Sequence, residues 1–147
     1  MTEGAGILVL CTGNSCRSQM AEALFRRELD GRLPVYSAGT EPTAEIHPVA
    51  RQVMEEEGLD LAGQRPKHLT EYLGRVPIHT IVIVCDGAAK SCPTVWPGAY
   101  ERLMWPVEDP AAFEGDAHAT LAKFRQVRNE LAGKIGEWNR TAAPAGT

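Results

Sequence analysis

The chain has 147 residues, 44% of them hydrophobic and 23% charged, with a formal net charge of -4. This composition suits one compact domain with a hydrophobic core and excludes a disordered chain. The 15 lysine and arginine residues are scattered along an acidic chain, which gives no electrostatic basis for a nucleic-acid partner.

The N-terminal segment predicts a strand, a tight loop and a helix. Residues 7–10 are an apolar run, and apolar residues at helical spacing follow from Ser18 to Leu29, with Glu22 outside the apolar face. Between these elements lies CTGNSCRS, residues 11–18. Successive backbone N–H groups in such a loop, together with a helix N-terminus, form a nest for a tetrahedral oxyanion. The predicted oxyanion-binding residues are Thr12, Gly13, Asn14, Ser15, Cys16, Arg17 and Ser18.

Cys11 stands at the bottom of this loop and is the predicted nucleophile. Donated N–H bonds, a helix N-terminus and a nearby cation lower the pKa of a thiol to about 3.5–7.5. Arg17 offers a planar fork for two oxyanion oxygens, and Ser18 is placed to donate a hydrogen bond to the sulfur. The alternative for Cys11 is a small buried hydrophobic residue that ends a strand. For Cys16, we expect packing against the sheet, with a resolving thiol as the alternative.

Further strands and helices alternate along the rest of the chain. The segment 78–84 is β-branched and almost continuously apolar, which is typical of a strand buried on both faces. Helical spacing of apolar residues predicts a long helix over 117–138. The remaining predicted elements are strands at 33–39 and 100–105, a helix that opens at His47-Pro48 and closes at Gly58, and a short helix at 69–73.

This alternation predicts an α/β fold, a single domain with a four-stranded, mostly parallel twisted sheet and helices on both faces. We place the domain at residues 1–140 and expect residues 141–147 to form a flexible C-terminal tail. Ligands in such sheets bind at the carboxyl ends of strands, and the loop 11–18 follows such an end.

The N-terminus has no basic segment, and the apolar run after it is too short for a signal peptide or a membrane span. We therefore expect a cytoplasmic protein without a membrane partner. In that reducing compartment, the four cysteines are expected to be thiols rather than structural disulfides.

The loop CTGNSCRS resembles the phosphate loop of the low-molecular-weight protein tyrosine phosphatases and of the arsenate reductases built on the same fold. The resemblance extends through Ser37-Ala38-Gly39-Thr40, the strand at 78–84 and Asp109-Pro110, so it covers nearly the whole chain. It implies a four-stranded parallel sheet, Cys11 as the nucleophile and Asp109 as the general acid. An acid speeds departure of an oxygen from the bound oxyanion, and Glu108 is a weaker candidate for that role.

Cys85 and Cys92 resemble the redox pair of the thioredoxin-coupled arsenate reductases. Cys11 and Cys85 each follow an apolar tetrad, so both thiols emerge at one sheet edge if the two strands are neighbours. Adjacent strands lie roughly 4.8 Å apart, and a disulfide needs Cα atoms about 4.4–6.8 Å apart, so a Cys11–Cys85 bond is reachable. A regular helix would hold Cys85 and Cys92 about 10 Å apart, so their bond requires the segment between them to remodel.

Two alternatives stand beside this redox pair. The two cysteines are unrelated buried residues, or they are half of a metal site. A zinc site needs further Cys or His at short spacing, and His79 and His118 do not provide it, so we expect no metal.

These observations predict arsenate reduction by a monomer with no bound cofactor. Cys11 attacks arsenate while Asp109 protonates the leaving oxygen, and Cys85 then attacks the Cys11 sulfur as arsenite leaves. Cys92 next attacks Cys85, and thioredoxin is the electron donor that reduces the final Cys85–Cys92 disulfide. The alternative is a low-molecular-weight phosphatase acting on phosphotyrosine or small phosphomonoesters. Such phosphatases carry a tryptophan after the second strand and tyrosines after Asp-Pro, where this chain has Thr43-Ala44-Glu45 and Ala111-Ala112-Phe113. The aromatic walls for a phosphotyrosine ring are largely missing, so we expect only weak phosphatase side activity. A non-catalytic oxyanion-responsive or redox-responsive module would leave Asp109 unexplained.

Overall fold

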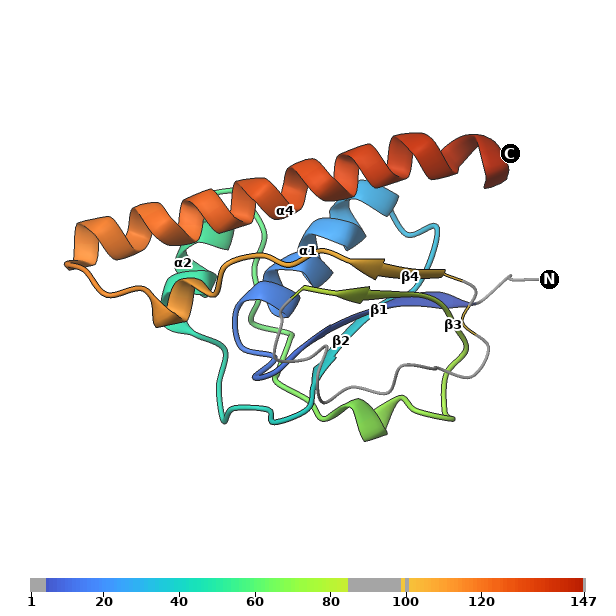
Figure 1. Ribbon diagram of the computed structural model, residues 1–147, viewed down its shortest axis with the longest axis horizontal. Helices are drawn as coiled ribbons and strands as arrows, with labels where there is room; N and C mark the ends of the chain where they lie inside the picture. Colours follow the sequence, from blue (N-terminus) through green and yellow to red (C-terminus); the bar gives the residue numbers. More distant parts are fainter. Residues whose placement is uncertain (1–4, 85–98, 100, 147) are drawn as a thin grey trace.

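The computed structural model describes residues 5–84, 99 and 101–146 of the chain (Figure 1). Cys85 and Cys92 lie outside the described residues. The elements in chain order are β1 (Gly6–Cys11), α1 (Arg17–Leu29), β2 (Val35–Gly39), α2 (Pro48–Glu55), the 3-10 helix η1 (Leu69–Glu71), β3 (Ile78–Ile83), β4 (Glu101–Met104), the 3-10 helix η2 (Pro110–Ala112) and α4 (Ala117–Gly146).

The four strands form one sheet in which every pair is parallel, in the order β2-β1-β3-β4. The predicted α/β fold and parallel sheet are therefore confirmed. All six residues of β1 are buried, as its apolar sequence requires for a central strand. β1 and β3 are neighbours, with Leu10 in register with Ile83, and the amide of Val84 donates to the carbonyl of Leu10 at 3.1 Å. The strand order thus places the end of β3 beside the end of β1.

Helix α1 lies between α4 and the sheet, and η1 lies on the opposite side of the sheet (Figure 1). The apolar stripe of α4 forms the outer part of the core through Phe124, Val127, Leu131 and Ile135, which are all buried. Trp138 packs edge-on against Phe25 of α1, with ring centroids 5.5 Å apart. The helix runs on to Gly146, beyond its predicted end at Trp138.

Helix α2 ends at Glu55, shorter than predicted, and the following turn closes at Gly58 with a φ of +75°. The cap residue Glu56 ties this end of α2 to α4, because Arg125 Nη2 lies 2.6 Å from Glu56 Oε2 and Arg128 Nη1 lies 2.9 Å from Oε1. Hydrogen bonds from Arg125 and Arg128 lower the pKa of Glu56 to about 2. The C-terminal end of α2 is thus attached to α4 by charge-assisted contacts.

We expect Glu56→Gln to lower Tm at pH 7, with a difference that shrinks as the pH falls. An unfolded glutamate titrates near 4.3, so the stabilisation is complete above that pH and is lost as the pH approaches about 2. Melting curves between pH 7 and pH 2 measure this difference, with Glu55→Gln on the same helix as control. A difference that stays constant across the range would contradict the assignment.

No helix among residues 5–84 and 101–146 combines the length and apolar character needed to cross a membrane.

Candidate active site

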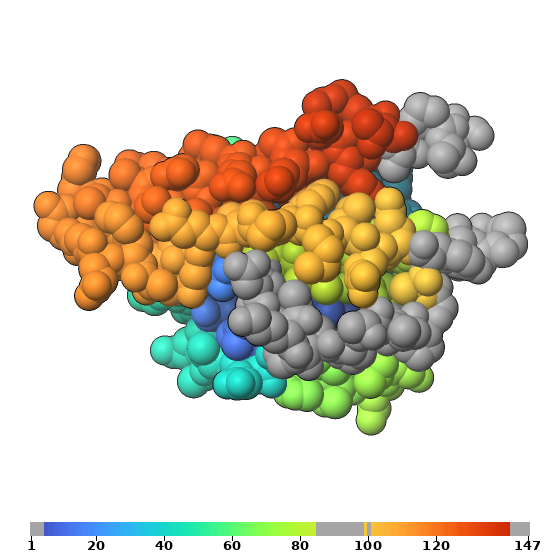
Figure 2. Space-filling view, in the orientation of Figure 1, coloured from blue at the N-terminus to red at the C-terminus, as the bar shows by residue number. Residues whose placement is uncertain are grey.

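The loop of residues 12–16 joins the carboxyl end of β1 to the N-terminus of α1 and forms the floor of an open cavity of about 760 Å³. Figure 2 shows this early part of the chain, in blue, at the surface between the cyan segment near residue 40 and the orange segment near residue 110. The wall residues from these two segments include Glu41, Thr43, Val107 and Asp109. The predicted oxyanion loop therefore lies at the carboxyl edge of the sheet, as expected for a parallel α/β fold.

Every backbone carbonyl from residue 11 to residue 16 accepts a hydrogen bond from a group outside the loop or from α1. In a trans peptide unit the C=O and the following N–H point in opposite directions. Outward-bonded carbonyls therefore turn the N–H groups of residues 12–17 toward the interior of the loop, where they form an anion nest. The donors to these carbonyls are the amides of Thr40, Glu41, Thr43, His47 and Met20 and the side chain of Gln19.

Asn14 has a left-handed backbone, with φ of +51°, as its residue type predicts. It is fully buried, and both ends of its side-chain amide make hydrogen bonds. The amide Nδ2 donates to Ser18 Oγ at 2.7 Å and to Ser37 Oγ at 3.0 Å, while Oδ1 accepts from the backbone N–H of Lys67 at 2.7 Å. These bonds hold the loop against β2 and against the segment before η1.

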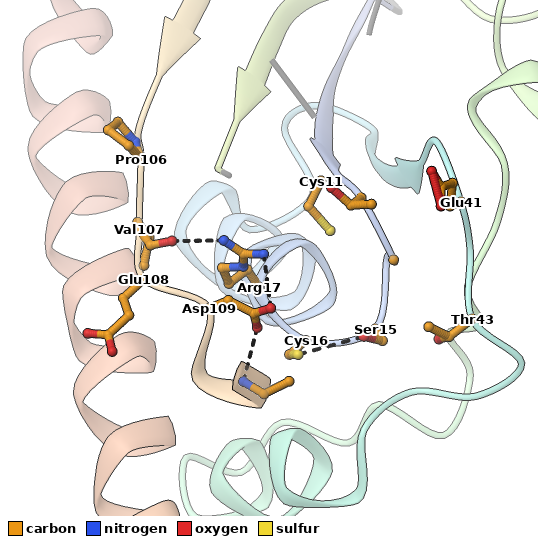
Figure 3. A pocket seen from close by; sticks show the side chains of 13 residues that line it. Cys11, Ser15, Cys16, Arg17, Glu41, Thr43, Pro106, Val107, Glu108 and Asp109 are labelled. Atoms are coloured by element: carbon orange, nitrogen blue, oxygen red, sulfur yellow. Dashed lines mark hydrogen bonds and ion pairs between the residues drawn. The ribbon is translucent and has the colours of Figure 1, made fainter. Parts of the chain in front are cut away.

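Cys11 is buried at the end of β1, and in the described part of the chain its sulfur lies within hydrogen-bonding distance of Ser18 and Asn14. Ser18 Oγ lies 2.8 Å from Cys11 Sγ, and the backbone N–H of Asn14 donates to the sulfur at 3.2 Å. Donors at this distance stabilise the thiolate over the thiol. The side chain points into the ring formed by the loop (Figure 3), where it would meet an anion held by the amides.

Arg17 and Asp109 meet at the mouth of the loop (Figure 3). Arg17 Nη1 donates to the carbonyl of Val107 at 2.9 Å, and Nη2 lies 3.6 Å from Asp109 Oδ2. Asp109 also caps η2, since Oδ1 accepts from the N–H of Ala111 at 3.0 Å. The carboxyl group is thus oriented toward the cavity while 41% of the side chain remains exposed, which leaves it open to proton exchange with water.

Glu108, the weaker acid candidate, is directed away from Cys11 (Figure 3). Its Oε1 lies 3.0 Å from Lys123 Nζ on α4. Geometry therefore favours Asp109 over Glu108 as the acid nearest the loop.

Cys16 is buried at the N-cap of α1, with Ser15 Oγ 3.7 Å from its sulfur. Burial raises the pKa of this thiol. A protonated, enclosed sulfur is a packing group, which supports the expectation made for Cys16. His47 and His68 act as N-cap residues of α2 and η1.

A buried polar cluster lies behind the loop. Glu22 was expected outside the apolar face of α1, but only 3% of it is exposed. Gln19 is also buried, and its Nε2 donates to the carbonyls of Asn14 and Arg65, both at 2.9 Å. The sequence carries a signal for this cluster, because the polar residues Ser18, Gln19 and Glu22 directly follow the loop and can support it from the side away from the cavity. The cluster consists of Asn14, Ser18, Gln19, Glu22, Ser37 and Lys67.

Gly39, in the segment Ser37-Ala38-Gly39-Thr40 at the end of β2, lies directly against the oxyanion loop. A Cβ at this position would collide with the carbonyl oxygen of Thr12, so only glycine lets β2 approach the loop. Its own N–H donates to the carbonyl of Lys67 at 2.8 Å.

Among the described residues, no group of three or more His, Cys, Asp or Glu could hold a metal ion.

Comparison with known proteins places this geometry in a family. Residues 6–143 match the family described as low molecular weight phosphotyrosine protein phosphatase. An arsenate reductase of Halalkalibacterium halodurans is 38% identical over 135 residues, covering 92% of this chain and 95% of the relative.

Solved structures extend the likeness. An arsenate reductase in a phosphate-binding state superposes with a TM-score of 0.78 at 28% identity, covering 93% of this chain and 98% of that one. A thioredoxin-dependent arsenate reductase of Corynebacterium glutamicum superposes with a TM-score of 0.75 at 27% identity, covering 96% of this chain and 63% of that one.

Proposed function

We propose that this chain, which belongs to the low molecular weight phosphotyrosine protein phosphatase family, is an arsenate reductase that converts arsenate to arsenite. The observation that carries the proposal is the loop, which holds Cys11 beneath inward-facing amides with Arg17 and Asp109 at its mouth. Relatives named arsenate reductase at up to 38% identity over nearly the full length support the choice of reaction within the family.

Arsenate binding is assigned to the amides of residues 12–17 and to the Arg17 guanidinium. The tetrahedral anion places its arsenic above the Cys11 sulfur and directs oxygens at the amides, which need no reorganisation to receive them. Arg17 Nη1 is held by the carbonyl of Val107, so the side chain is already ordered before the anion arrives. Binding an oxygen through Nη2 therefore costs little further side-chain entropy. An acidic chain binds an anion in this way because the donors act at contact distance.

Covalent chemistry begins when the Cys11 thiolate attacks arsenic(V). Asp109 gives a proton to the leaving oxygen, which departs as water and leaves a thiol-arsenate adduct. Cys85 then attacks the Cys11 sulfur, the sulfur–arsenic bond breaks, and arsenic leaves as arsenite with the electron pair of that bond. The products are a Cys11–Cys85 disulfide and arsenic(III).

The relay then moves the disulfide away from the loop. Cys92 attacks Cys85, the Cys11 thiolate is released, and thioredoxin reduces the Cys85–Cys92 disulfide. Adjacent β1 and β3, with Leu10 opposite Ile83, support the first exchange, because Cys85 follows β3 closely in the chain. The three thiols and a thioredoxin partner suit a cytoplasmic monomer that works without a bound cofactor.

We expect Asp109→Asn to slow formation of the thiol-arsenate adduct by about 10²-fold, because general acid catalysis contributes 10² or more. Anion binding should be retained, since the amides and Arg17 are unchanged. Rapid-mixing single turnovers with arsenate measure the rate, and titration with phosphate measures binding. Glu108→Gln is the matched control, because that carboxylate pairs with Lys123 instead of facing the loop. Wild-type rates in Asp109→Asn would transfer the acid role to Glu108 or to water.

Phosphomonoester hydrolysis is the second candidate function, because the family is named for it and the loop alone does not distinguish phosphate from arsenate. None of the described residues that line the cavity is aromatic, and Thr43 and Ala111 stand on its walls. A phosphotyrosine ring would therefore find little stacking surface. Weak hydrolysis of a small aryl phosphate is the expected side activity, and its rate beside arsenate reduction distinguishes the two functions.

A further inference from the structure

Two oppositely charged side chains are buried behind the oxyanion loop, away from the cavity. Glu22 of α1 and Lys67, just before η1, are exposed by only 4% and 8% of their side chains. Glu22 Oε1 lies 3.9 Å from Lys67 Nζ, and Glu22 Oε2 lies 2.6 Å from Arg26 Nη2. Burying charges costs free energy even in a pair, so such a pair calls for an explanation. Neither residue touches the cavity, which leaves support of the loop as the role to examine.

The orientation of the Asn14 amide is fixed by Lys67 through its backbone. A backbone N–H can only donate, so the atom of Asn14 at 2.7 Å from Lys67 N must be the amide oxygen. The amide nitrogen then faces Ser18 and Ser37 and donates one hydrogen to each hydroxyl oxygen, at 2.7 Å and 3.0 Å.

Each serine hydroxyl has a single hydrogen, so its remaining bond is also determined. Ser37 donates its hydrogen to Glu22 Oε1 at 2.5 Å, since its oxygen already accepts from Asn14. Ser18 has its hydrogen available for Cys11 Sγ at 2.8 Å, although this contact by itself does not say which atom donates. The network therefore has one direction, with hydrogens running from Asn14 outward to the carboxylate at one end and to the sulfur at the other.

We propose that Lys67 is a positioning residue that holds this network in the direction that makes Ser18 a hydrogen-bond donor to Cys11. Its backbone N–H orients the Asn14 amide, and its ammonium group, which bonds to the Arg65 carbonyl and lies 3.9 Å from Glu22 Oε1, holds that N–H in place. The proposal rests on the proposed function only in taking Cys11 as the nucleophile.

Contacts around Lys67 show that its ammonium group is held rather than free to leave. Lys67 Nζ donates to the carbonyl of Arg65 at 2.5 Å, and the Lys67 carbonyl accepts from Gly39 at the end of β2. Burial lowers the pKa of Lys67 and the nearby Glu22 opposes that shift, so the two charges support one another.

The other charged or titratable groups near the pair are Arg26, Arg65, Glu71 and Tyr72. Those that share the cavity with Cys11 are Arg17, Glu41, Glu108, Asp109 and Cys16.

Alkylation of Cys11 by iodoacetamide as a function of pH tests the proposal in the full-length protein. Peptide fragmentation by mass spectrometry separates Cys11 from Cys16, which lies in the same tryptic peptide. We expect Lys67→Met to raise the pH of half-maximal alkylation by about one unit, so that alkylation below that pH slows about tenfold. The control is Lys134→Met, which replaces a lysine of α4 outside the cluster and should leave the profile unchanged.

Glu22→Gln and the double variant keep the test decisive if Lys67→Met folds poorly. Glutamine at position 22 offers no charge to hold the Lys67 ammonium in place, so adding Lys67→Met to Glu22→Gln should shift the Cys11 profile no further. The arsenate reduction rate of Lys67→Met should recover as the pH is raised, which a general loss of structure would not allow.

A Lys67→Met protein with the wild-type alkylation profile would overturn the proposal, as would shifts that simply add in the double variant. Neither result depends on arsenate or thioredoxin. A failure of wild-type arsenate reduction with the alkylation shift intact would instead reject the proposed function alone.

Discussion

Replacement of Cys11 by serine is expected to abolish arsenite formation, with a loss of more than about 10⁴-fold. A serine hydroxyl at the same position remains protonated at neutral pH and is a poor nucleophile toward arsenic. It also cannot form the disulfide whose formation reduces arsenic(V) to arsenic(III). The measurement is arsenite released in a single turnover by excess enzyme. Phosphate binding should persist, because the loop that presents the amides of residues 12–17 is held by bonds to its carbonyls from groups other than the sulfur.

Cys16→Ser is the matched control for this experiment, since it removes the other described thiol of the same loop. Burial raises the pKa of Cys16, so it is a thiol rather than a thiolate at neutral pH, and its replacement should leave most of the activity. Arsenite release by Cys11→Ser at a rate near that of the wild type would invalidate the whole site assignment.

The second large effect is expected for Cys92→Ser, which should allow one turnover and then stop. Cys11 and Cys85 remain, so the first arsenite leaves and a Cys11–Cys85 disulfide stays behind, because the thiol that would release Cys11 is missing. Arsenite should therefore plateau at one equivalent per enzyme, and the intact protein should lose the mass of two hydrogens.

Cys85→Ser separates the steps further. It should stop before arsenite leaves, with the arsenic still attached to Cys11, because no neighbouring thiol can attack the Cys11 sulfur. Continued turnover by Cys92→Ser with thioredoxin would show that the relay needs only two thiols and would contradict the proposed order of exchanges.

The sheet could be predicted because its strands carry their own signal. Residues 7–10 and 78–84 are apolar enough to identify buried strands, and a Cys at the end of each gave a reason to place them side by side. β1 and β3 are indeed neighbours. The position of the oxyanion loop followed from the same reasoning, because a loop between a buried strand and an amphipathic helix has few places to lie.

The support behind the loop could not be predicted in the same way. Glu22 has the pattern of a polar-face residue of a helix, but it lies buried beside Ser37 and Lys67, which are distant in the chain. Lys67 also lies in a segment with weak secondary-structure signal. Local pattern does not reveal such long-range pairing. The Arg17 contact to the Val107 carbonyl was hidden for the same reason, since it joins the start of α1 to the segment after β4.

The most direct test of arsenate reduction is NADPH oxidation by the wild-type protein with arsenate, thioredoxin and thioredoxin reductase. Hydrolysis of an aryl phosphate is run beside it with the same enzyme. We predict arsenate-dependent NADPH oxidation, with one arsenite formed for each NADPH consumed, and aryl phosphate hydrolysis that is slow by comparison. Rapid aryl phosphate hydrolysis without any arsenate-dependent NADPH oxidation would contradict the account and identify the protein as a phosphatase.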